Sequence, residues 1–595
     1  MVGYTSKQDG NYMNKQLLVE RDVMVPMRDD INLATDIYRP DDNDEHPVLV
    51  HRIPYNKSVA HYTGSQMVNP IVAAEHGYVV VVQDCRGCFV SEGIMEPYTQ
   101  EADDGYDCVE WAASQPWSNG NVGIYGSSYM GITCLQTAIA APPHLKAVMA
   151  YLTGTNFYQG WMYSGGALEL GFNMGYTHGK ARQAIPRLNL TSERKAYLLE
   201  ELRSSGANRE ALSRFLPLSE APILKESDVL PYWKEYLEHP NYDDYWEKLD
   251  VVARVSDIKA PVFHIAGWYD QFLKGHLDLN LALQQHPDKS IRDTHRFIVG
   301  PWDHNSYEGH RLTRAGDRDF GLKALSGVMA VDHLLFDWFD YWLKGEKTPL
   351  MEQPQTRYFS MPVENDWVEC ESWPPESNSL TYYLHSEGSA NSRFGDGKLT
   401  NLPPGPESKD TFVYDPLDPV PTVGGRTFSL AAGGSGVQDQ ANVEERNDVL
   451  VFTSDVLSES LHIAGNITAE MWITSSAPDT DFTAKLVDVS QDGYCAVVAD
   501  GILRARFRNS YETPEFLVPE KPTLITIDLW DTAYTFEAGN SIRLEISSSS
   551  FPRFSRNANS TVQPEFAREE DFVSATQCVL HDEEHPSKLL LPVHN

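Results

Sequence analysis

The sequence has little positive charge to offer a polyanion. Lys and Arg together number 48 against 84 Asp and Glu, and the resulting formal charge of −36 is spread along the chain. Attraction to phosphates supplies much of the affinity of proteins for nucleic acid, and basic surfaces also draw proteins to anionic lipid. We therefore expect neither nucleic acid nor a membrane as a partner.

Signals for export and for membrane insertion are missing as well. Residues 1–15 (MVGYTSKQDGNYMNK) contain no apolar run of the kind found in signal peptides, which favours a cytoplasmic protein. Residues 111–145 lack Asp, Glu, Lys and Arg, but Gly, Asn, Ser and Pro interrupt them. They cannot supply the ~20 apolar residues of a membrane helix and are expected to be buried in protein.

Groups that form disulfides or hold cofactors are equally scarce. The seven cysteines are an odd number, thinly spread through 595 residues, and favour reduced thiols. The sequence has no phosphate-binding loop and no dinucleotide fingerprint, and its 19 His residues form no zinc-helix motif with supporting ligands. We expect no cofactor and no metal. Cys85 and Cys88 form an isolated C-x-x-C pair that we interpret as incidental, beside a turn or ion pair made by Asp84 and Arg86.

The first 150 residues alternate short β-branched runs with helical patterns. Continuous apolar runs at residues 46–52 and 78–83 are typical of strands that are covered on both faces of a sheet. Helical spacing at residues 103–114 and 133–141 separates these runs from later strands. Such βαβ alternation predicts an α/β fold with a mostly parallel sheet.

The α/β pattern is first interrupted and later replaced. Helical patterns dominate from about residue 156 to 250, apolar strands resume at residue 262, and strand-like alternation fills the chain beyond residue 354. We therefore expect four segments: the first part of an α/β core (1–155), a helical cap insertion (156–250), the second part of the core (251–350) and an all-β sandwich or jelly roll (351–595).

The strongest local signal for chemistry is the segment GIYGSSYMG at residues 123–131, where a predicted strand passes into a predicted helix. A sharp strand-to-helix turn lifts one Ser to the helix N-terminus and places the next backbone N–H as an oxyanion donor. Gly126-x-Ser128 fits such a turn, although the usual pattern has Gly at 130, where this chain has Met. A Gly/Ser-rich loop is the alternative, and position favours Ser128 over Ser127.

Two downstream strands each end in a residue that could complete a catalytic site. VFHIAGWYD ends in Asp270, and FIVGPWDH ends in His304. Catalytic groups gather at the carboxyl ends of parallel strands, and the order Ser128, Asp270, His304 is the one expected of the α/β-hydrolase fold. Taken singly, the Asp could cap a helix and the His could be structural. Together, in this order and at strand ends, they predict a nucleophile, an acid and a base.

These motifs resemble those of the cocaine esterase / X-prolyl dipeptidyl aminopeptidase family of serine hydrolases. The resemblance covers nearly the whole chain and includes RIPYNK at residues 52–57, QDCRG at 83–87, and EW and QPW between 110 and 117. It implies an α/β-hydrolase core with an inserted helical cap and a C-terminal β jelly-roll domain. The family pattern G-x-S-Y-x-G also accounts for Met130 and Gly131.

The resemblance also implies roles for individual residues. Ser128 would be the nucleophile, His304 the general base and Asp270 its orienting acid. Tyr55 would donate its phenol O–H to the oxyanion beside the backbone N–H of Tyr129, the alternative for Tyr55 being a loop aromatic packed on the sheet.

Three further residues match positions where relatives contact their substrates. They are Trp161, Gln271 and Phe272, and ordinary packing of the cap is the alternative for each. Trp161 and Phe272 are candidate walls of a pocket for a neutral or aromatic group.

The predicted activity is hydrolysis of a small-molecule carboxylic ester or amide through an acyl-enzyme on Ser128. The hydrolase pattern begins by about Val19, without the extra N-terminal domain that the resemblance associates with X-Pro peptidases, so neutral or aromatic acyl groups and esters are expected to be favoured. An X-Pro dipeptidyl peptidase, an amide acylase or an acyltransferase would use the same triad. A non-catalytic binding protein is the alternative from another class, and a homo-oligomer stays open.

Overall fold

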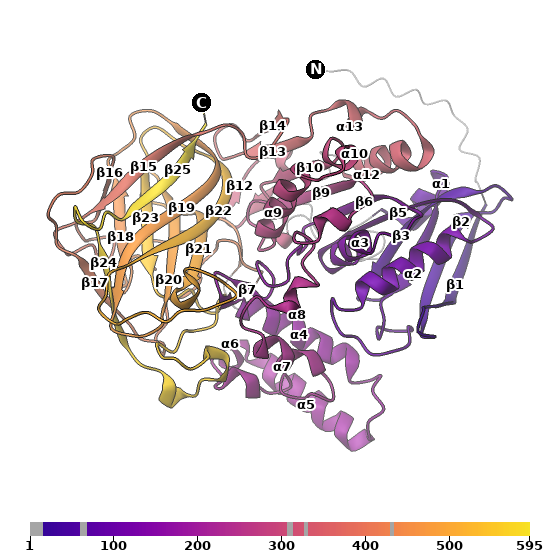
Figure 1. Cartoon of the computed structure of the whole chain (residues 1–595), viewed down its shortest axis with the longest axis horizontal. Coiled ribbons are helices and arrows are strands. Elements are labelled where there is room, and N and C mark those ends of the chain that lie inside the picture. The colour runs from indigo at the N-terminus through magenta and orange to yellow at the C-terminus, as the bar shows by residue number, and fades with distance from the viewer. Residues whose placement is uncertain (1–15, 60–67, 306–312, 326–330, 429–433, 595) are drawn as a thin grey trace.

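A computed structural model describes residues 16–59, 68–305, 313–325, 331–428 and 434–594. Three parts are visible in Figure 1: an α/β core, helices that project below it, and a sheet-rich C-terminal part coloured orange to yellow. No helix within the described ranges is both long and apolar enough to cross a bilayer. All seven cysteines are free thiols.

The core is built on a mixed sheet whose centre is parallel. Neighbouring strands from β4 to β13 run parallel, and antiparallel strands complete both edges. In spatial order the strands are β1 (Leu17–Pro26), β2 (Asn32–Pro40), β4 (Val79–Asp84), β3 (His46–Ile53), β5 (Ser118–Ser127), β6 (Leu145–Tyr151), β9 (Val262–Gly267), β10 (Arg296–Gly300), β13 (Thr356–Ser360) and β14 (Asp366–Cys370).

Helices cover both faces of this sheet, which explains its continuous apolar strands. One face packs against α1 (Pro70–Glu75) and α12 (Val331–Phe339). The other packs against α2 (Glu101–Ala113), α3 (Ser128–Ala140), α9 (Leu273–Gln284) and α10 (Lys289–Arg292). Every residue of β4 is buried, as expected for a strand with no solvent face.

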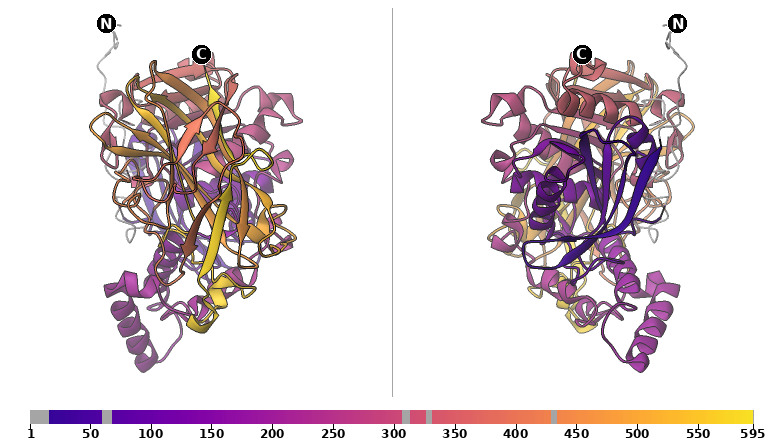
Figure 2. Two further views of the ribbon diagram at one scale, coloured as in Figure 1. Left: turned by 90° about the vertical axis from the view of Figure 1, so that its left-hand side faces the viewer. Right: turned by 90° about the vertical axis from the view of Figure 1, so that its right-hand side faces the viewer.

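The cap helices lie between β6 and β9 in the chain and project from one end of the molecule (Figure 2). A short hairpin of β7 (Tyr163–Ser164) and β8 (Ala167–Leu168) leads into them. The helices are α4 (Leu170–Ala184), α5 (Ser192–Ala207), α6 (Arg209–Ser213), α7 (Pro231–Glu238) and α8 (Asp244–Glu247). Their buried side chains form one aromatic-rich cluster that reaches the core at Tyr129 and Phe272.

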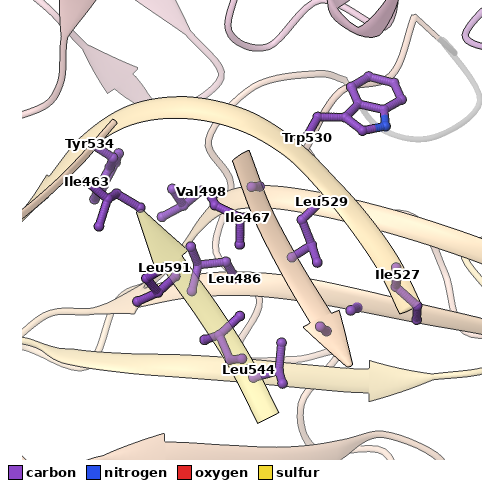
Figure 3. Packing of buried hydrophobic residues seen from close by; sticks show 14 of the residues in the cluster. Ile463, Ile467, Leu486, Val498, Ile527, Leu529, Trp530, Tyr534, Leu544 and Leu591 are labelled. Carbon is purple, nitrogen blue, oxygen red and sulfur yellow. The ribbon is translucent and has the colours of Figure 1, made fainter. Parts of the chain in front are cut away.

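The C-terminal part consists of strands whose apolar interior is continuous with the α/β core, because one cluster of buried side chains also includes Trp268, Phe297 and Tyr358. Side chains of several of these strands meet inside it, among them Ile467, Leu486 and Leu544 (Figure 3). The strands are β15 (Asn378–His385), β16 (Lys398–Thr400), β17 (Asp410–Tyr414), β18 (Leu450–Ser454), β19 (Leu461–Ser475), β20 (Asp481–Val489), β21 (Cys495–Arg504), β22 (Thr523–Phe536), β23 (Ser541–Ser547), β24 (Ala575–Leu580) and β25 (Lys588–Val593).

Two details differ from the sequence-based expectations. Strands β13 and β14 lie beyond the expected core boundary at residue 350, yet β13 pairs with β10, so the core sheet continues to Cys370. Of the two alternatives for Asp84 and Arg86, the turn is present, with the Cys88 N–H bonded to the Cys85 carbonyl at 3.0 Å, whereas Arg86 forms its ion pairs with Asp104 and Asp29. Asp84 instead accepts the backbone N–H of Lys57 at 2.8 Å.

Candidate active site

The turn between β5 and α3 holds Ser128 in a strained backbone conformation. Its φ is +51°, in the left-handed region that a residue with a side chain enters at a cost of about 1–3 kcal/mol. Such strain at a strand-to-helix turn lifts a Ser hydroxyl out of the sheet at the helix N-terminus. Ser128 is the first residue of α3, whereas the sequence pattern predicts this helix only from residue 133.

Small residues flank this turn because neighbouring atoms leave no space for side chains. A Cβ on Gly126 would lie 2.5 Å from the Met130 carbonyl oxygen, and one on Gly131 would lie 2.6 Å from Cβ of Thr153. The hydroxyl of Thr153 donates to the carbonyl oxygen of Ser128 at 2.6 Å. The second glycine of the motif therefore stands at 131 because position 131 faces the residue that supports the turn.

The predicted acid and base meet Ser128 in one hydrogen-bond chain. Nε2 of His304 lies 3.1 Å from the Oγ of Ser128, and Nδ1 of His304 lies 2.8 Å from Oδ2 of Asp270. The second carboxylate oxygen of Asp270 accepts the backbone N–H of Phe272 at 2.7 Å. Asp270 and His304 are only 1% and 4% exposed, so the hydrogen bond between them is largely shielded from water.

A pair of buried histidines supports the turn from behind. The backbone N–H of Thr153 donates to Nε2 of His276 at 2.9 Å, which leaves the ring proton of His276 on Nδ1, facing Nδ1 of His264 at 3.2 Å. Burial lowers the pKa of His276 to about 3 and lowers that of His264 as well. Both rings are therefore neutral at neutral pH, so the hydrogen bond from Thr153 to His276 does not depend on pH in that range.

The two predicted oxyanion residues follow neighbouring strands of the sheet, Tyr55 after β3 and Tyr129 after β5, and these strands pair in parallel. Tyr129 follows Ser128 at the start of α3; its phenol O–H donates to Oε1 of Glu101 at 2.8 Å, and Glu101 is held in turn by Arg52. Burial raises the pKa of the Tyr129 phenol, which keeps it a donor. Tyr55 follows β3 and is half-buried, and its ring packs against the aromatic cluster of the cap.

The three predicted substrate-contacting residues fall into two groups. Trp161 and Phe272 are buried and stacked, with ring centroids 4.4 Å apart, and Phe272 meets the His304 ring edge-on at 5.2 Å. Gln271 is held by a hydrogen bond, because its Oε1 accepts the backbone N–H of Phe428 at 3.1 Å. Gln271 therefore links the core to the C-terminal part.

Phe428 is a site residue that the sequence analysis missed. Its ring lies 4.6 Å from the ring of His304, although it belongs to a loop of the C-terminal part. No periodicity or motif surrounds it, so no local signal could have identified it. Among the described residues, no group of three or more His, Cys, Asp or Glu side chains is arranged to hold a metal ion.

Comparison with known proteins identifies the family. Residues 29–306 match the model of the X-Pro dipeptidyl-peptidase (S15) family, and residues 349–590 match the C-terminal non-catalytic domain of X-Pro dipeptidyl-peptidases. The cocaine esterase of Rhodococcus sp. (strain MB1 Bresler) is 34% identical over 98% of this chain and 99% of its own length. The chain belongs to the S15 family of cocaine esterase and X-Pro dipeptidyl-peptidases.

Two solved structures resemble this chain over nearly its whole length. An aminopeptidase from the marine sediment archaeon Thaumarchaeota archaeon has a TM-score of 0.80 and 25% identity, covering 100% of this chain and 98% of its own. An α-amino acid ester hydrolase has a TM-score of 0.78 and 25% identity, covering 99% and 100%. The predicted fold class, an α/β-hydrolase core with a helical cap and a C-terminal β domain, is confirmed, and the chain is a serine hydrolase of esters or peptides.

Proposed function

We propose that Ser128 is the nucleophile of an ester or amide hydrolase, with His304 as the general base and Asp270 as its orienting acid. The observation that carries this assignment is the chain of hydrogen bonds from Asp270 through His304 to the Oγ of Ser128, at 2.8 and 3.1 Å. The strained φ of +51° at Ser128 supports it independently, because strain of this kind concentrates at functional turns.

The geometry supports a two-step reaction. His304 accepts the hydroxyl proton at Nε2 as Ser128 attacks the carbonyl carbon, and Asp270 stabilises the imidazolium through Nδ1–H. The imidazolium then protonates the leaving alcohol or amine, and the acyl group stays on Ser128. His304 next removes a proton from water, which attacks the carbonyl of the acyl-enzyme. The imidazolium then returns this proton to the Oγ of Ser128 as the bond to the acyl group breaks and the acid leaves.

The developing oxyanion requires hydrogen-bond donors near Ser128. We assign them to the backbone N–H of Tyr129, at the N-terminus of α3, and to the phenol O–H of Tyr55. Two donors fixed before the reaction stabilise the tetrahedral intermediate without reorganisation, and removing one such donor typically costs about 10²–10³ in kcat.

Substitution of the two adjacent serines tests the nucleophile. Ser128→Ala should lower kcat by about 10⁴–10⁶ and abolish labelling by a fluorophosphonate, with the unfolding transition unchanged. The matched control is Ser127→Ala, which we expect to keep most of the activity and all of the labelling. Comparable losses in both variants, or labelling that survives Ser128→Ala, would exclude this assignment.

We further propose that neutral or aromatic acyl groups are favoured. The side chains packed against the His304 ring within the described part of the chain include the aromatic rings of Phe272 and Phe428, and Trp161 stacks on Phe272. Rings of this kind attract apolar and aromatic groups. The competing class is α-amino acyl substrates, which the names of the aminopeptidase and the α-amino acid ester hydrolase favour.

A comparison of four substrates separates the two classes. We expect kcat/KM for a nitrophenyl ester of an aromatic acid to exceed that for an X-Pro anilide and for the nitrophenyl ester of a free α-amino acid. The fourth substrate is the N-acetylated amino-acid ester. A preference for a free amine that disappears on acetylation would assign the chain to the α-amino acyl class.

A further inference from the structure

Lys180 is a buried cation beside the candidate oxyanion hole. It lies on cap helix α4 and is 4% exposed. Its ammonium donates to the backbone carbonyl of Pro54 at 3.2 Å and to the side-chain oxygen of Gln183 at 3.4 Å. Among the described residues, no carboxylate forms an ion pair with it.

Aromatic faces take the place of a counter-ion. The ammonium of Lys180 lies 4.5 Å from the centre of the Tyr55 ring, 5.2 Å from that of Tyr176 and 5.6 Å from that of Tyr129. Cation–π contacts of this kind are worth up to about 2 kcal/mol when they are shielded from water. Burial alone lowers the pKa of Lys180, an effect that the nearby Glu101 and two cysteines oppose.

The segment that carries Tyr55 is held from two sides. From the core, Asp84 accepts the backbone N–H of Lys57 at 2.8 Å, which fixes a turn in which Asn56 has a φ of +82°. From the cap, Lys180 holds the carbonyl of Pro54, the residue directly before Tyr55. The cap thus contributes a polar contact to the segment that carries Tyr55, directly before the tyrosine.

We propose that Lys180 is a positioning residue of the oxyanion hole, which fixes the Pro54–Tyr55 segment and makes the Tyr55 phenol a stronger hydrogen-bond donor. This inference rests on the proposed role of Tyr55. The phenol gains negative character as it donates to the oxyanion, and a cation close to its ring stabilises that charge. Because the charge develops only during the reaction, Lys180 acts on kcat more than on KM.

A double-mutant cycle between Lys180 and Tyr55 tests the inference. Lys180→Met removes the charge and keeps the length of the side chain, and Tyr55→Phe removes the phenol O–H and keeps the ring. We expect Lys180→Met to lower kcat about tenfold with KM within about twofold, and to lower it less than about twofold further when Tyr55→Phe is already present. Lys180→Arg, which keeps the cation, should recover most of the loss.

The matched control is Lys195→Met on cap helix α5. Lys195 also donates to a proline carbonyl, that of Pro186 at 2.9 Å, but on the exposed side of the cap. We expect its kcat to equal that of the wild type. Lys180→Gln serves as a second uncharged variant if Lys180→Met does not fold, as judged by thermal unfolding and fluorophosphonate labelling.

The possible outcomes separate this inference from the proposed function. If Lys180→Met causes the same loss in the wild type and in the Tyr55→Phe variant, or if Lys180→Arg recovers nothing, the role of Lys180 is overturned and that of Tyr55 is left intact. Full kcat in the single variant Tyr55→Phe would overturn the oxyanion role of Tyr55 itself, and the inference with it.

Discussion

The hydrogen bond from Thr153 to the Ser128 carbonyl offers a direct test of how the proposed nucleophile is held. Thr153→Val keeps the shape of the side chain and removes only the hydroxyl that donates at 2.6 Å. A hydrogen bond to a partly buried carbonyl contributes about 0.5–1.5 kcal/mol, and the left-handed conformation of Ser128 costs about 1–3 kcal/mol. The bond therefore offsets a large part of the strain in the turn.

The expected result is a fall in kcat of about tenfold, which corresponds to about 1.4 kcal/mol, with little change in KM. Thr155→Val is the matched control, because Thr155 is equally buried and donates to the Gly275 carbonyl at 2.8 Å, away from the turn. Steady-state kinetics with an aryl ester and urea unfolding of both variants provide the comparison. We expect similar losses of stability and a loss of kcat in Thr153→Val alone; equal kcat in the two variants would refute the argument.

Two further substitutions probe the surroundings of the site. Burial raises the pKa of Asp84 to about 6, above its usual value of 3.8, so the folded state binds its proton more tightly than the unfolded state. The stability that this proton contributes is complete below pH 3.8 and is lost as the pH rises through 6. In urea unfolding, the free energy of unfolding of Asp84→Asn relative to that of the wild type should therefore increase by about 1 kcal/mol between pH 5 and 7.5. A relative increase towards acidic pH would contradict this. Gln271→Leu removes the acceptor for the Phe428 N–H, and we expect the KM for an aryl ester to rise about fivefold with a smaller change in kcat. An unchanged KM in Gln271→Leu would show that the bond does not position Phe428.

The elements that carry the reacting groups could be predicted because their signals are local. A buried strand followed by a polar residue is a pattern of about ten residues. This pattern predicted the ends of β9 and β10, after which Asp270 and His304 lie. The strand-to-helix turn at Ser128 was readable from glycines that the packing requires. Each signal is contained in one segment of the chain, and the parallel sheet brings the segments together.

The pairing partners of strands and the edges of the sheet are harder to predict from the sequence. The antiparallel strands β1 and β2 form an edge of the sheet, and β1 is half-exposed with a mixed polar and apolar pattern, so its period is weak. The strand β13 is readable as a strand, but its partner β10 lies more than fifty residues earlier, and no local feature assigns it to the core. The partners of such strands therefore could not be predicted from the local sequence.

The residues that surround the reacting groups could not be predicted for a related reason. Lys180 comes from the cap and Phe428 from the C-terminal part, and each approaches the site only through packing between parts of the chain that are distant in sequence. The core therefore fixes the chemistry, whereas the cap and the C-terminal part adjust the surroundings of Tyr55 and His304. Because neither Lys180 nor Gln271 takes part in the hydrogen bonds from Asp270 to Ser128, substitutions at these two positions can change rate or selectivity without removing those bonds.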